Sequence, residues 1–252
     1  MKPRAEQRRD RAESLDPPRP DATRNLGFAI VYELRRSYHD RIAELRDRSA
    51  DIIGDAASAT VEVTRAFLEG DRAAGRSIVI STSAAAANVA LVETDVLDLL
   101  ALQSPVARDL RVILAARDIA RAGELCLGLC RTLAARVGGA QDVLSPGLRD
   151  LIAEMGSETA DLLRRANGAW TTLDEEQAGA VIVNAESCRQ LQRAFLAELL
   201  ELRLVPVDAA VDLGMTGRMY ERVTDHAVEI VRRVLFVLTG VRPGERAGTS
   251  PS

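Results

Sequence analysis

Residues 220–240 read YERVTDHAVEIVRRVLFVLTG, and this stretch decides the fold class. Its apolar residues are spaced by three or four positions, as on one face of an α-helix: Val223, Ala227, Ile230, Val234 and Leu238. Gly240 is expected to end this helix, because glycine readily adopts the left-handed conformation found after helix C-termini. The stretch therefore predicts the last part of a long amphipathic helix.

Glu221 and Asp225 form a pair of carboxylates within the same stretch. Residues four positions apart share a helix face, and this face is nearly opposite the apolar stripe. Two acids at this spacing repel each other mildly, and a bound cation would remove the repulsion. Oxygen ligands suit hard or borderline metal ions. On spacing alone, however, a solvated helix face is the commoner interpretation of such a pair.

The composition favours a helical protein. Of the 252 residues, 47% are hydrophobic but only 3% are aromatic, so the core is aliphatic and suited to helix-on-helix packing. The net charge of -4 argues against direct nucleic-acid binding. The sequence contains no run of 18 apolar residues and therefore predicts no membrane span. Its charged, proline-rich start does not resemble a signal peptide. The three cysteines include no C-x-x-C pair, which fits a reducing cytosol.

The helical pattern is interrupted by the same kinds of residue in the two halves of the sequence. Three landmarks recur after 101–103 residues: Gly54 and Gly156, Asp71 and Asp174, Pro105 and Pro206. Such a register indicates an internal duplication. The sequence therefore predicts an all-α fold of two tandem three-helix bundles, residues 26–138 and 146–240, between tails 1–25 and 241–252 that are too poor in apolar residues to pack.

Two segments resemble the PhoU family of bacterial phosphate-transport regulators. One comprises ERVTDHA at 221–227 with VLFVLTG at 234–240, and the other is LLALQSPVARDLR at 99–111. The similarity extends over residues 33–240, and the ending is most similar to actinobacterial members. The resemblance implies a two-bundle helical fold and a non-enzymatic, cytoplasmic protein that negatively regulates phosphate uptake and the phosphate-starvation response. It also implies a homodimer that contacts the ATPase of the phosphate ABC transporter and a phosphate-sensing histidine kinase.

The same resemblance implies metal binding at an acid-x-x-x-Asp motif in each repeat, as a divalent cation or an iron cluster. Glu221 and Asp225 match the motif in the second repeat. The corresponding positions of the first repeat are Ala120 and Glu124, so one ligand is missing there and the other is altered. Asp118 is a poor replacement, since it lies about 160° around the helix from Ala120. We expect a metal site in the second repeat and a weak or lost site in the first.

Other residues offer less chemistry. Cys126 and Cys130 are one helical turn apart among apolar neighbours, which favours core packing over metal ligation. His226 points about 100° away from Asp225 and is expected at the rim of the acid pair. A metal-dependent phosphate-ester hydrolase and a purely structural helical scaffold remain alternatives to the regulatory function.

Overall fold

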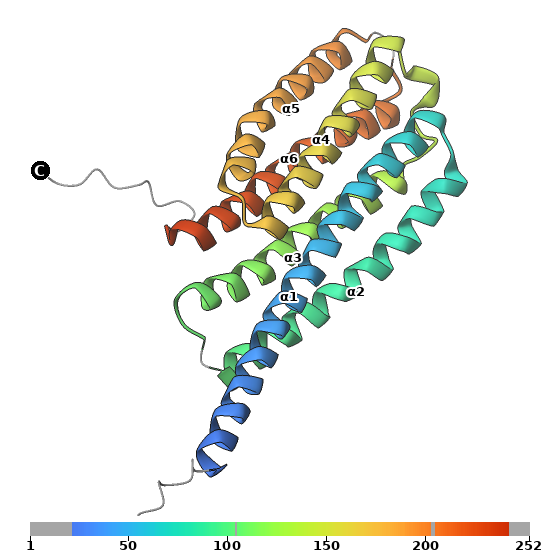
Figure 1. Cartoon of the computed structure of the whole chain (residues 1–252). Coiled ribbons are helices and arrows are strands. Elements are labelled where there is room, and N and C mark those ends of the chain that lie inside the picture. The colour runs from blue at the N-terminus through green and yellow to red at the C-terminus, as the bar shows by residue number, and fades with distance from the viewer. Residues whose placement is uncertain (1–21, 104, 203–204, 242–252) are drawn as a thin grey trace, which may run out of the picture. The chain divides into compact units, whose positions relative to one another are not determined.

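The structure, a computed structural model, describes residues 22–103, 105–202 and 205–241. The described residues form six α-helices and one 3-10 turn, without a strand: α1 Ala22–Glu69, α2 Arg72–Gln103, α3 Ala107–Ala134, η1 Gln141–Val143, α4 Pro146–Thr172, α5 Glu175–Glu201 and α6 Val207–Thr239 (Figure 1). The predicted all-α fold is confirmed. None of these helices is both long and apolar enough to span a membrane.

The predicted helix ends are largely confirmed. Asp71 caps α2, because its carboxylate accepts hydrogen bonds from the backbone nitrogens of Ala73 and Ala74 at 2.9 and 3.0 Å. Asp174 caps α5 through the backbone nitrogen of Gln177 at 3.0 Å. Gly240 follows α6 with φ 78°, the left-handed conformation expected there.

Two helix starts differ from the sequence-based expectation. α1 begins at Ala22, before the predicted start at residue 26. α3 begins at Ala107, and its cap is Val106, whose side chain makes no capping hydrogen bond. The predicted capping residue Ser104 lies outside the described residues, as do residues 1–21 and 242–252 of the predicted tails.

Contacts divide the chain into two units, Met1–Asp40 and Arg41–Ser252. Within the second unit, α4, α5 and α6 contact one another, α2 contacts α3, and α3 contacts α6. Residues 41–69 of α1 belong to the same unit and reach three other helices: Arg48 pairs with Asp95 of α2, Thr60 contacts Cys130 of α3, and Trp170 of α4 bonds Ser49. The division into bundles 26–138 and 146–240 stays a prediction, which superposition of the two halves would test.

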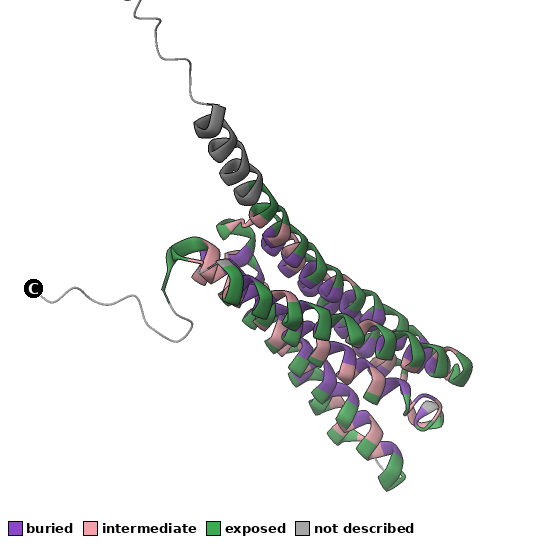
Figure 2. Ribbon diagram, turned by 90° about the horizontal axis from the view of Figure 1, so that it is seen from below, coloured by how far each residue is buried: buried purple, intermediate pink, exposed green. Residues whose placement is uncertain are grey.

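The core of the second unit lies on the inner faces of its helices (Figure 2). Its largest buried side chains are Trp170, Tyr220, Phe67 and Phe195, and the rest are mostly aliphatic. The buried Tyr220 hydroxyl lies 2.7 Å from the Thr64 hydroxyl and thus joins α6 to α1. α6 is therefore fixed on its inner side, and its outer side carries the acid pair.

Candidate functional site

The acid pair of α6 faces outward, as predicted. Val223 and Ile230 are buried in the core, whereas the side chains of Glu221 and Asp225 are 41% and 57% exposed. The 3.6-residue helical period alone explains this division of the helix. The two carboxylates are accessible to solvent and to any ligand.

Arginines already neutralise both carboxylates. Arg218, one turn earlier in α6, lies 2.5 Å from Glu221. Arg189 reaches across from α5 to Asp225 at 3.4 Å. These guanidinium groups contribute the positive charge that a cation would otherwise supply.

The residues present do not fit a tightly held metal cluster. The described part of the chain contains no group of three or more His, Cys, Asp or Glu side chains that could hold a metal ion. Calcium takes about six to eight oxygen ligands and structural zinc about four protein ligands. Two carboxylates, each paired with an arginine, fall short of either set. A metal at Glu221 and Asp225 stays a prediction, and it would have to share the two carboxylates with the guanidinium groups.

The matching position of the first repeat has a different environment. Ala120 is completely buried, so a carboxylate there would lose its hydration. Glu124 is half-exposed and lies 3.6 Å from Arg121 of the same helix. The position of Ala120 therefore belongs to the core, where a small apolar residue such as alanine fits.

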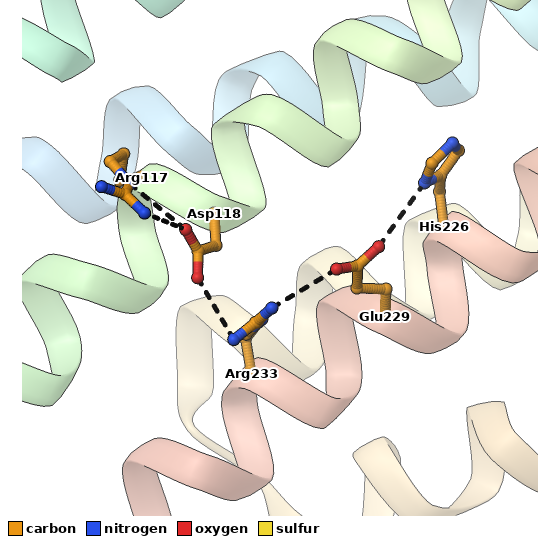
Figure 3. Close-up of polar contacts among 5 residues, drawn as sticks. All are labelled: Arg117, Asp118, His226, Glu229 and Arg233. Carbon is orange, nitrogen blue, oxygen red and sulfur yellow. Dashed lines mark hydrogen bonds and ion pairs between the residues drawn. The ribbon is translucent and has the colours of Figure 1, made fainter. Parts of the chain in front are cut away.

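Asp118 takes part instead in a polar network between α3 and α6 (Figure 3). It pairs with Arg117 at 3.0 Å and with Arg233 of α6 at 3.2 Å. Arg233 also reaches Glu229 at 3.4 Å, and Glu229 lies 3.7 Å from Nδ1 of His226. The network links the two predicted repeats, and it includes the acid that the sequence analysis set aside.

His226 is more enclosed than a rim residue. Its side chain is only 13% exposed, and burial lowers its pKa, although Glu229 opposes the shift. A lowered pKa favours the neutral imidazole, so His226 adds no positive charge to the acid face at neutral pH. The sequence placed His226 beside the acid pair as a rim residue, and the structure adds that its side chain is largely buried.

The three cysteines are free and buried, which confirms the core interpretation of Cys126 and Cys130. Burial raises the pKa of all three thiols, that of Cys130 to about 11. Since the thiolate is the nucleophile and the metal ligand, these cysteines are poorly suited to either role.

The metal prediction is tested by comparing two substitutions. Glu221→Ala should remove most of any bound metal, because it deletes one of two neighbouring carboxylates. Glu124→Ala should leave the metal content unchanged. Neither should unfold the protein, since surface changes usually stay within about 0.5 kcal/mol. The test is the metal content per chain, measured on the purified wild type and both variants. Equal metal loss in both variants, or no metal in the wild type, would show that the acid pair is only a solvated helix face.

Comparisons with known proteins place this geometry in a family. Residues 152–234 match the PhoU domain. The chain is 34% identical to the Mycobacterium leprae "Phosphate-specific transport system accessory protein PhoU homolog 1" over 83% of this chain and 96% of the relative. The Mycobacterium tuberculosis PhoU homolog 2 is also 34% identical, over 83% and 100%, whereas a Caulobacter vibrioides homolog is 26% identical, over 81% and 91%.

Solved structures agree on the fold. The crystal structure of PhoU from Pseudomonas aeruginosa superposes with a TM-score of 0.75 at 17% identity, covering 81% of this chain and 100% of that one. PhoU from Streptococcus pneumoniae gives 0.73 at 18% identity, covering 82% and 100%. At this identity the structural likeness establishes the helical fold alone. The mycobacterial relatives establish the family, and they are more similar to this chain than the Caulobacter homolog is. The chain belongs to the PhoU family, and it is more similar to these actinobacterial members.

Proposed function

We propose that this protein regulates phosphate transport, restraining phosphate uptake and damping the phosphate-starvation response. The observation that carries the proposal is the 34% identity over almost the full length of a relative named as an accessory protein of the phosphate-specific transport system. A match over 83% of the chain concerns most of the helical scaffold rather than one shared helix.

The chemistry of the surface supports a binding role rather than catalysis. The described thiols are buried, and the acid pair is neutralised by Arg218 and Arg189. A hydrolase of the metal-dependent kind needs an ion with an open coordination position in a site that limits water. Guanidinium groups already pair with both carboxylates of the acid face, and we therefore favour a non-enzymatic regulator.

We further propose two cytoplasmic partners, the ATPase of the phosphate ABC transporter and a phosphate-sensing histidine kinase. Association with transport and signalling components follows from the family's role as transport accessory proteins. These partners are proteins, which fits a negatively charged chain without a nucleic-acid-binding composition.

A homodimer is proposed through α2. Ile80 and Leu91 are 73% and 52% exposed, and Ala84 and Ala87 lie between them at the three- and four-residue spacing of one face. Small residues between two large apolar ones allow a second helix to approach closely, and an exposed apolar stripe marks an interaction surface. Light scattering should give a dimer mass for the wild type and a monomer mass for Ile80→Glu. A monomeric wild type contradicts this proposal.

Deletion of the gene tests the function directly. In a host without a second family member, phosphate-starvation genes should stay expressed in phosphate-rich medium, because the restraint on the response is gone. Transcript levels of those genes, with and without a plasmid carrying the wild-type chain, measure the effect. Normal repression in the deletion strain contradicts the proposed function.

A further inference from the structure

An arginine-lined pocket lies where the start of α2, the segment after α3 and the start of α6 meet. Its volume is about 770 Å³, open solvent included, and its polar lining side chains are Arg72, Arg76, Arg136 and Asp212. The lining thus carries three positive charges and one negative charge. This pocket is separate from the acid pair of Glu221 and Asp225.

Arg72 is held in place without losing its charge. Its Nη2 donates a hydrogen bond to the backbone oxygen of Gly138 at 3.1 Å, and that acceptor is a neutral carbonyl. Gly138 has φ 91°, and a Cβ there would lie 2.4 Å from Nε of Arg72. The positive φ favours glycine here, and the missing Cβ leaves room for the Arg72 side chain.

Among the described residues, Arg136 is the pocket arginine that pairs with a carboxylate. Its Nη1 lies 2.5 Å from Oδ1 of Asp212, and the pair joins the segment after α3 to α6. Gly139 allows the close approach of Asp212, because a Cβ at this glycine would lie 2.4 Å from Oδ2. The carboxylate compensates one of the three guanidinium charges.

Arg76 has no hydrogen bond or ion pair to any described residue. It is exposed and follows Arg72 by four positions, so the two share one face of α2. The nearest acid of this helix end, Asp71, uses its carboxylate to cap the backbone nitrogens of Ala73 and Ala74. Its charge reduces the local positive potential, but its oxygens do not bind the pocket arginines.

We propose that Arg72, Arg76 and Arg136 bind the phosphate group of a small molecule. A guanidinium presents a planar fork of donors that matches phosphate oxygens, and such charge-assisted hydrogen bonds are the strong ones. Inorganic phosphate and a phosphorylated metabolite share this chemistry. A bound phosphate competes with Asp212 for Arg136 and so loosens the link between α3 and α6. The regulatory use of the site rests on the proposed function, whereas binding itself does not.

Calorimetric titration of the full-length protein tests the proposal with three probes, inorganic phosphate, pyrophosphate and ATP, at constant ionic strength. Saturable binding by at least one probe is expected, and the tightest probe separates free phosphate from a phosphorylated metabolite. Arg72→Gln and Arg76→Gln should each weaken binding about tenfold or more, the effect of losing one hydrogen bond to a charged group. Arg232→Gln, an exposed arginine of α6 outside the pocket, should bind as the wild type does.

Asp212→Asn gives a result of opposite sign. It removes the carboxylate that competes for Arg136, so phosphate binding should strengthen several-fold. Asp150→Asn removes the same charge from α4 outside the pocket and should have no such effect. Circular dichroism confirms that each variant is folded.

Two results overturn the proposal. One is the absence of saturable binding by all three probes. The other is equal weakening in Arg232→Gln and the two pocket variants, which indicates general attraction of anions to arginines. Neither result alters the expected deletion phenotype, so failure of this site and failure of the proposed function are distinguishable.

Discussion

Trp170→Ala should lower the free energy of unfolding by about 3–5 kcal/mol, the usual effect of removing a large buried aromatic side chain. Trp170 is completely buried in α4. Its indole nitrogen donates to the Ser49 hydroxyl of α1 at 2.9 Å, and the Arg46 guanidinium lies 5.7 Å from its ring centre. Alanine removes the hydrogen bond, the cation–π contact and the packing together, and it leaves a cavity between α4 and α1.

Urea unfolding followed by far-UV circular dichroism measures this effect. Trp170 is the single tryptophan of the chain, so its fluorescence cannot be used for the variant. Trp170→Phe is the matched control, because it keeps an aromatic ring and loses the indole donor. We expect it to lower the free energy of unfolding by about 1–2 kcal/mol. Ser49 still donates to the backbone oxygen of Arg46 at 2.8 Å in both variants. A loss below 1 kcal/mol for Trp170→Ala would contradict the packing of α4 on α1.

The helices and their ends were predictable because their signals are local. The apolar stripe of α6 and the caps Asp71, Asp174 and Gly240 each depend on residues within about one turn. One local signal was misleading. Ser104-Pro105 has the composition of a helix start, yet α3 begins at Ala107 after an uncapped Val106, and no short-range pattern in the sequence indicates this shift.

Long-range partners could not be predicted from one sequence. Nε of Arg111 in α3 donates to the backbone oxygen of Val237, at the end of α6, at 3.2 Å. An arginine at a helix C-terminus satisfies carbonyl groups that lack intrahelical donors. Backbone carbonyls carry no sequence signature, so only the packing of α3 against α6 reveals this acceptor.

In the candidate site, too, the local features were predictable from the sequence and the long-range contacts were not. The outward position of Glu221 and Asp225 followed from helical periodicity, and the Arg218 partner of Glu221 lies three positions away, within reach of a sequence argument. Arg189, the partner of Asp225, belongs to α5 and lies 36 positions away in the sequence. The neutralisation of the acid pair therefore depends on how α5 packs against α6.

Gly156→Ala should destabilise the protein although alanine is the better helix former. Gly156 lies within α4, where alanine is favoured over glycine by about 1 kcal/mol. A Cβ at this position would lie 2.4 Å from the Thr64 hydroxyl oxygen and 2.9 Å from Thr64 Cβ. Thr64 is stiff at χ1, and its hydroxyl is engaged by Tyr220 at 2.7 Å and by the Thr60 carbonyl at 2.6 Å. Forced overpacking of this kind costs about 1–3 kcal/mol, enough to reverse the gain in helix propensity.

Gly179→Ala is the matched control, because Gly179 lies in α5 and a Cβ there meets nothing within 4 Å. This substitution should stabilise the protein by about 0.4–1 kcal/mol, so the two glycines should respond with opposite sign in the same urea titration. Thr64→Ala removes both atoms that a Cβ at Gly156 approaches most closely, at 2.4 and 2.5 Å. The double variant Gly156→Ala/Thr64→Ala should therefore be less destabilised than the sum of the two single variants. Stabilisation by Gly156→Ala, or strict additivity in this cycle, would show that α4 does not approach α1 at Thr64.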